Sequence, residues 1–144
     1  MTQPAKRSPL PPALSLRLDC SFAAVRSGAV QIRNYLHGCG LAEKEIWACE
    51  LAFVEGCNNA VQHTPDAYTS KKIVVELHLQ GGYVELRINE HSRGCDLPAE
   101  SALPSAESET GRGIFLMRSL MDDVAYIRNN SSNCLVLKKA VTGI

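Results

Sequence analysis

Three polar side chains recur every fourth residue in the stretch ELAFVEGCNNAVQHT. Glu55, Asn59 and His63 stand at positions i, i+4 and i+8, so a helix would carry them on one side. A carboxylate in such a place can accept the proton of an attacking hydroxyl group. An amide oxygen one turn further on is a suitable hard ligand for Mg²⁺, which keeps several waters and takes phosphate oxygens as further ligands. This spacing is therefore compatible with a groove for a phosphorylated ligand and its metal.

Two interpretations of this polar stripe are open. Small residues lie on or beside it, among them Ala52, Gly56 and Ala60, and bulky side chains such as Trp47 cover the side expected to face the core. If the stripe is solvated, the alanines are ordinary helix formers. If the stripe lines a ligand groove, the small residues leave room for another body to approach closely.

A second polar feature stands at the end of an expected strand. Glu90 closes the alternating run YVELRINE and precedes Gly94 by four residues. An acidic side chain at a strand end can accept a hydrogen bond from the amino group of adenine, and a glycine lets the backbone approach a base. The alternative is a plain exit from strand to loop.

A third feature is the segment ETGRGIFLM, which places Gly111 and Gly113 at the mouth of an expected helix. Exposed N–H groups and the helix dipole make such a place favourable for phosphate. Arg112 would add a fork of donors for phosphate oxygens. A single Gly-x-Gly is weak evidence on its own.

The expected elements can position these features in one sandwich. Strands are predicted by alternation, helices by apolar spacing, and a helix end by Pro65. The order is strand, helix, helix, strand, strand, a long polar loop over residues 91–110, helix, strand, strand. Because hairpins dominate, we expect a mixed or antiparallel sheet with helices on one face, a two-layer α/β sandwich.

Composition narrows the classes of function. The 144 residues fit one domain, and fifteen basic residues balance fifteen acidic ones, which argues against bulk binding to nucleic acid or anionic membranes. Residues 1–12 are expected to form a flexible tail without a secretory signal, ahead of a domain over 13–144. The six cysteines form no Cys-x-x-Cys pair, so we expect reduced thiols in a cytoplasmic protein.

Taken in order, the three features resemble a known fold. The Glu-x-x-x-Asn helix, the acidic strand exit and the Gly-x-Gly helix start resemble the GHKL (Bergerat) ATP-binding fold of the histidine kinases. Within that group, the segments VEGCNNAVQH and GRGIFLMRSLMDDV are most similar to the anti-sigma-factor serine/threonine kinases. The resemblance covers about residues 13 to 140.

The resemblance implies an activity and its residues. Members of that family bind ATP and Mg²⁺, sequester a sigma factor and phosphorylate a serine on a small anti-anti-sigma partner of the STAS type. Glu55 would be the general base, Asn59 the Mg²⁺ ligand and residues 91–110 the ATP lid. The residues implied to bind ATP are Asn59, His63, Glu90, Gly94, Gly111, Arg112, Gly113 and Asn133. Phosphoryl transfer is mostly positioning and charge neutralisation, so this short set is chemically sufficient.

The chain also departs from the family pattern. The family usually has Asp at position 90, Gly at position 92 and Gly-Thr before the last strand, where this chain has Glu90, Ser92, Ser132 and Asn133. Glu is one methylene longer than Asp, so the contact with adenine must shift. Asn133 can still form a hydrogen bond near the base.

Three functions are compatible with these residues. The first is a protein serine kinase that also binds a sigma factor, and the second is a nucleotide-responsive binding module without kinase activity. The third is a stand-alone ATPase. Because relatives commonly pair, the resemblance also implies a homodimer, and it implies no direct contact with nucleic acid or membrane.

Overall fold

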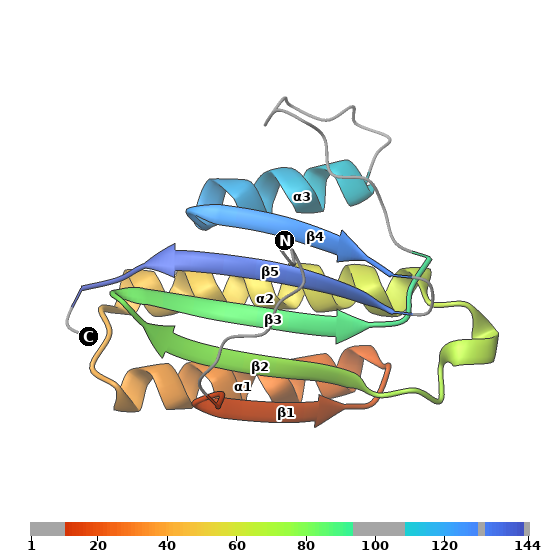
Figure 1. Ribbon diagram of the computed structural model, residues 1–144, viewed down its shortest axis with the longest axis horizontal. Helices are drawn as coiled ribbons and strands as arrows, with labels where there is room; N and C mark the ends of the chain where they lie inside the picture. Colours follow the sequence, from red (N-terminus) through yellow and green to blue (C-terminus); the bar gives the residue numbers. More distant parts are fainter. Residues whose placement is uncertain (1–10, 94–108, 130–131, 143–144) are drawn as a thin grey trace, which may run out of the picture.

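The structure, a computed structural model, describes residues 11–93, 109–129 and 132–142 (Figure 1). The elements, in chain order, are β1 (Leu14–Leu18), α1 (Phe22–Gly38), α2 (Glu43–His63), a 3₁₀ helix (Asp66–Tyr68), β2 (Ile73–Gln80), β3 (Tyr83–Glu90), α3 (Glu109–Leu120), β4 (Asp123–Arg128) and β5 (Asn133–Ala140).

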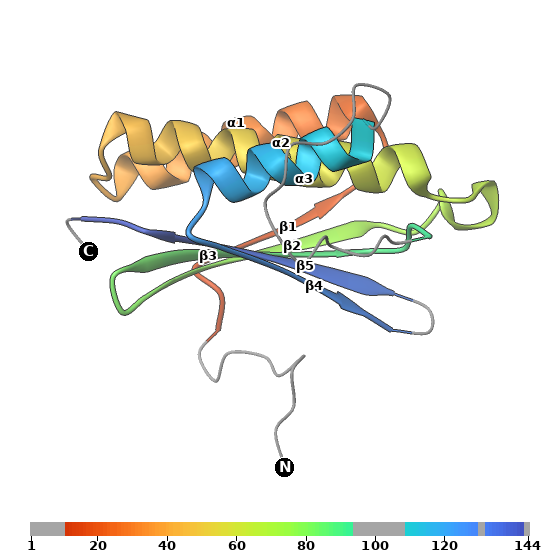
Figure 2. The ribbon, with the colours of Figure 1, turned by 90° about the horizontal axis from the view of Figure 1, so that it is seen from above.

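The five strands form one sheet in the order β1-β2-β3-β5-β4, and every neighbouring pair is antiparallel. The last strand of the chain, β5, therefore lies between β3 and β4. The helices α1, α2 and α3 all lie on one face of this sheet (Figure 2). The predicted two-layer sandwich is confirmed, and the described strands make the sheet antiparallel throughout.

Local sequence signals account for several element boundaries. Ser21 caps α1, because its Oγ accepts the N–H of the residue three positions later at 3.1 Å. The helix α2 ends at His63, two residues before Pro65, which cannot continue a helix. Gly81 and Gly82 have φ values of 61° and 80° and form the tight turn between β2 and β3.

Two expectations fall on residues outside the described part of the chain. These are most of the tail at 1–12 and most of the loop at 91–110, which includes Gly94. Both stay predictions.

The side of α2 that was expected to face the core does so, with the exception of Trp47. Ile46, Cys49, Phe53 and Cys57 are fully buried. Trp47 is 53% exposed, whereas Ala52, Gly56 and Ala60 are buried. A Cβ atom built on Gly56 would lie 2.5 Å from Cδ2 of Leu135, on β5. The body that the small residues accommodate is therefore the protein's own sheet. The helical projection was therefore wrong for Trp47 alone, and it did not show that the small residues beside the polar stripe also pack against the core.

This close approach leads to a prediction about stability. We expect Gly56→Val to lower the free energy of unfolding by about 2–3 kcal/mol, because the added carbons would push against Leu135 and Ile88. Urea denaturation followed by circular dichroism measures this difference. The matched control is Gly38→Val in α1, since a Cβ there meets no atom within 4 Å. Equal effects of the two substitutions would contradict the packing argument.

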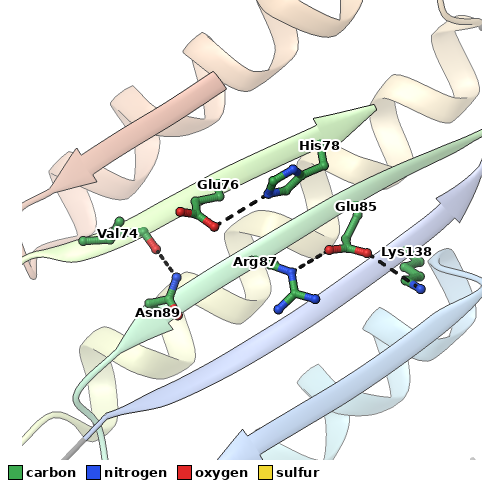
Figure 3. Close-up of polar contacts among 7 residues, drawn as sticks. All are labelled: Val74, Glu76, His78, Glu85, Arg87, Asn89 and Lys138. Atoms are coloured by element: carbon green, nitrogen blue, oxygen red, sulfur yellow. Dashed lines mark hydrogen bonds and ion pairs between the residues drawn. The ribbon is translucent and has the colours of Figure 1, made fainter. Parts of the chain in front are cut away.

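The sheet face opposite the helices carries paired charges (Figure 3). His78 Nε2 lies 3.6 Å from Glu76 Oε1, and Arg87 Nε donates to Glu85 at 2.6 Å. Lys138 Nζ lies 3.7 Å from the same Glu85 carboxylate. His78 Nε2 is buried and forms no hydrogen bond within the described residues. Among the described elements no helix covers this face, and the contacts of Glu85 with Arg87 and Lys138 help to satisfy its charged groups. We therefore assign this network a structural role.

Candidate functional site

A cleft of about 300 Å³ opens between α2 and α3. It is polar, and its lining comes from two segments that lie far apart in sequence. The lining residues are Glu55, Asn58, Asn59, Gln62, Arg112, Gly113 and Leu116. The fold thus brings the proposed base, the proposed metal ligand and part of the Gly-x-Gly segment to one place.

The backbone of α3 lies directly against the two central polar side chains at Gly113. A Cβ atom built on Gly113 would lie 2.9 Å from Asn59 Nδ2 and 3.1 Å from Glu55 Oε2. Both distances are shorter than ordinary van der Waals contact, and the 2.9 Å separation is one that real Cβ atoms essentially never show. A side chain at position 113 would therefore displace the Asn59 amide or the Glu55 carboxylate, and the glycine leaves these two groups in place beside the cleft.

The helix α3 begins earlier than the sequence suggested. Its first described residue is Glu109, so Gly111 lies in the first turn of the helix and Gly113 at the start of the second. Only the first four N–H groups of a helix lack an intrahelical partner, and Gly111 supplies one of them whereas Gly113 does not. The contribution of Gly113 to the cleft is consequently its missing side chain.

The two ends of the polar stripe in α2 behave differently. His63 is the last residue of α2, it is not among the residues that line the cleft, and its carbonyl accepts the Arg93 N–H at 3.1 Å. Asn58 and Gln62 line the cleft although the sequence pattern suggested no role for them. Their spacing of three and seven residues from Glu55 is the signal that could have found them, because such positions share a helix face.

Glu90, at the end of β3, is only 4% exposed and is held by four hydrogen bonds. The Ser92 N–H and Asn133 Nδ2 donate to its Oε1 at 2.7 Å and 3.1 Å. The hydroxyl groups of Tyr126 and Ser92 donate to its Oε2 at 2.9 Å and 3.0 Å. The expected contact with adenine would require at least one of these donors to move.

A buried thiol lies behind the site, on the core side of α2. Cys57 is fully buried. Burial, and to a lesser degree the nearby Glu90 carboxylate, raise the pKa of this thiol. Cys57 is therefore a packing residue of the core, where burial disfavours the thiolate form that a nucleophile needs.

With this geometry established, comparison with known proteins identifies the domain. The model of the family described as "Histidine kinase-like ATPase domain" matches residues 19–139. The chain belongs to this family. The fold and family predicted from the sequence are thereby confirmed.

One similar protein has a name that states an activity, and this activity is a property of that relative. The serine-protein kinase RsbW of Listeria innocua is 23% identical over 134 residues, which are 87% of this chain and 85% of that protein.

Two solved structures share the fold of this histidine kinase-like ATPase domain. The RsbU and RsbW domains of Rv1364c from Mycobacterium tuberculosis match with a TM-score of 0.70 and 23% identity, over 94% of this chain and 33% of that one. The SiaB–SiaC complex from Pseudomonas aeruginosa matches with a TM-score of 0.62 and 15% identity, over 90% of both chains.

A histidine kinase-like ATPase domain has to accommodate a nucleotide and its metal, and the residues at the metal end of this site fit them. The Oδ1 atom of Asn58 is buried and accepts no hydrogen bond within the described residues. Asn59 stands one position away in the same cleft. Amide oxygens of this kind suit Mg²⁺, and phosphate oxygens and waters would complete its coordination. The described residues contain no cluster of three or more His, Cys, Asp or Glu that could hold a metal ion by itself.

The residues expected to contact the adenine base of the nucleotide fit it less well. All four donors around Glu90 are internal, and an ionised carboxylate has about four acceptor positions. The amide groups of Asn58 and Asn59 are therefore better suited to bind a nucleotide and its metal than the carboxylate of Glu90 is.

None of the described helices has the length and apolar character needed to cross a lipid bilayer.

Proposed function

We propose that this histidine kinase-like ATPase domain is an ATP-dependent protein serine kinase that also acts as an anti-sigma factor. The observation that carries the proposal is the close approach of Gly113 to Glu55 and Asn59, which leaves a polar cleft around a carboxylate and an amide. A relative at 23% identity that carries the name serine-protein kinase also supports it.

The residues of the cleft divide the chemistry between them. Glu55 accepts the proton of the serine hydroxyl on a protein partner, which makes that oxygen a better nucleophile. Asn59 holds the metal, and Arg112 contributes donors to phosphate oxygens. ATP, when bound, supplies the phosphoryl group, and Mg²⁺ neutralises its charge. Phosphoryl transfer depends mostly on positioning the reacting groups. The main contribution of the fold to this reaction is therefore the close contact of α2 with α3 beside Gly113.

The other residues proposed to bind ATP are His63, Gly94, Gly111 and Asn133. The proposed substrate is a serine on an anti-anti-sigma factor of the STAS type, and the second partner is a sigma factor. A homodimer and a cytoplasmic location complete the proposal.

Removal of the metal tests the proposed reaction. We expect purified protein with Mg²⁺ and γ-labelled ATP to transfer label to a serine of a STAS partner, and EDTA to abolish the transfer. Excess Mg²⁺ added after EDTA should restore it, which controls for denaturation. Phosphoserine is located by mass spectrometry. Transfer that continues unchanged in EDTA would refute a role for the metal. Release of labelled inorganic phosphate without any partner would favour a stand-alone ATPase.

One observation favours a second function, a binding module without kinase activity. The Glu90 carboxylate is fully engaged by internal donors, which weakens the expected recognition of adenine. Such a module would bind its partner without transferring a phosphoryl group to it. A stable complex with the partner in Mg²⁺-ATP, in which mass spectrometry finds no phosphoserine, would favour this function over the kinase.

A further inference from the structure

The environment of Glu90 is complete without any ligand. Each of its two carboxylate oxygens accepts two hydrogen bonds, at distances of 2.7 Å to 3.1 Å. Since an ionised carboxylate offers about four acceptor positions, the described residues already fill its capacity.

The four donors come from three different strands or their ends. Ser92 follows β3, Asn133 opens β5 and Tyr126 lies on β4. Because the sheet order is β3-β5-β4, the Tyr126 hydroxyl reaches Glu90 across an intervening strand. Asn133 Nδ2 also donates to the Ser92 carbonyl at 2.9 Å, so the donors are linked to one another as well as to Glu90.

We infer that Glu90 serves as an internal hub that joins β3, β4 and β5, and that it does not select the nucleobase. This inference rests on the proposed binding of a nucleoside triphosphate. With the carboxylate saturated, the C6 amino group of adenine gains no charged acceptor. The domain should therefore bind purine triphosphates with little preference for adenine.

The hydroxyl groups beside Glu90 are also compatible with weak selection of the nucleobase. The hydroxyl oxygens of Ser92 and Tyr126 lie 3.4 Å apart, next to Glu90. Because both hydroxyl groups donate to Glu90 Oε2, they can offer a base only neutral acceptor oxygens. A hydrogen bond to a neutral acceptor is weaker than one to a carboxylate, so it selects the group at C6 less strongly.

Comparison of ATP with inosine triphosphate tests the inference, because the two differ at C6 of the base. Calorimetry with Mg²⁺ should give dissociation constants within about threefold of each other for the wild-type protein. A hydrogen bond to a charged acceptor would instead separate them by about ten- to a hundredfold. A wild-type preference for ATP above tenfold that disappears in Glu90→Gln would overturn the inference.

A second variant makes the result sharper. Tyr126→Phe removes one donor from Glu90 Oε2 and leaves an acceptor position for adenine. We expect this variant to prefer ATP over inosine triphosphate by about tenfold, which is one hydrogen bond to a charged group. The matched control is Tyr83→Phe, since Tyr83 is 44% exposed at the far end of β3. An unchanged ratio in Tyr126→Phe would count against saturation of Glu90.

The role of Glu90 as a hub can be measured without any nucleotide. Glu90→Gln replaces two acceptor oxygens with one oxygen and one donor, so some of the four donors face an NH₂ group. We expect the melting temperature of the nucleotide-free protein to fall by more than about 5 °C. An unchanged melting temperature would refute the hub. If neither nucleotide binds to any variant, the proposed function and the base-selection part of the inference both fail, while the melting temperature still decides the hub.

Discussion

Glu55→Gln should reduce phosphoryl transfer to a protein serine by about 10²- to 10⁴-fold, the usual contribution of a general base. The amide keeps the shape of the side chain beside Gly113, where a Cβ would lie 3.1 Å from Glu55 Oε2. It cannot take up the proton of the attacking hydroxyl. Affinity for Mg²⁺-nucleotide should stay within a few fold, because the carboxylate is not one of the proposed metal ligands.

The measurement is the initial rate of label transfer from γ-labelled ATP, alongside calorimetry with a non-hydrolysable analogue. Glu43→Gln is the matched control, since it makes the same change on the first turn of α2. The Glu43 side chain is 61% exposed and pairs with Arg33, a surface contact of small energetic value. Transfer by Glu55→Gln at the wild-type rate would show that the base has been wrongly assigned.

Gly113→Ala should impair the site from the opposite side of the cleft. The new methyl group would lie 2.9 Å from Asn59 Nδ2, so either the amide or the start of α3 has to shift. A displacement of about 1 Å in a positioning group can reduce a rate by about a hundredfold. We expect a loss of that order in transfer, together with a loss of Mg²⁺-dependent nucleotide affinity of about tenfold or more.

Gly38→Ala provides the control for this substitution, because a Cβ at Gly38 meets nothing within 4 Å. Circular dichroism and the melting temperature establish that both variants are folded. If Gly113→Ala binds nucleotide and transfers phosphate like the wild type, the contact between α2 and α3 does not define the site.

Local periodicity was sufficient for most of the fold. Alternation predicts the described strands, the Gly81–Gly82 pair predicts their tight turn, and Pro65 predicts the end of α2. Each of these signals depends on neighbours within a few residues along the chain. For the same reason the i, i+4 spacing is enough to predict that Glu55 and Asn59 share one side of a helix.

What the sequence could not supply depends on contacts between distant segments. The close approach of Gly56 to Leu135 depends on the packing of α2 on β5, and no pattern within α2 specifies that strand. The four bonds of Glu90 depend on Tyr126, which comes into range only because of the strand order β3-β5-β4. The glycine at position 113 could be noticed in the sequence, but the side chains it touches could not.

The place of β5 has a consequence for the way this protein is made. β3 pairs with β5 across its whole length, and α3 and β4 are inserted between them in the chain. A nascent polypeptide leaving the ribosome therefore carries β3 with one side unpaired until residues 133–140 have been synthesised. Such an open edge is a place where growing chains associate wrongly. Since α3 and the partners of Glu90 also arrive late, the cleft between α2 and α3 can be assembled only near the end of translation.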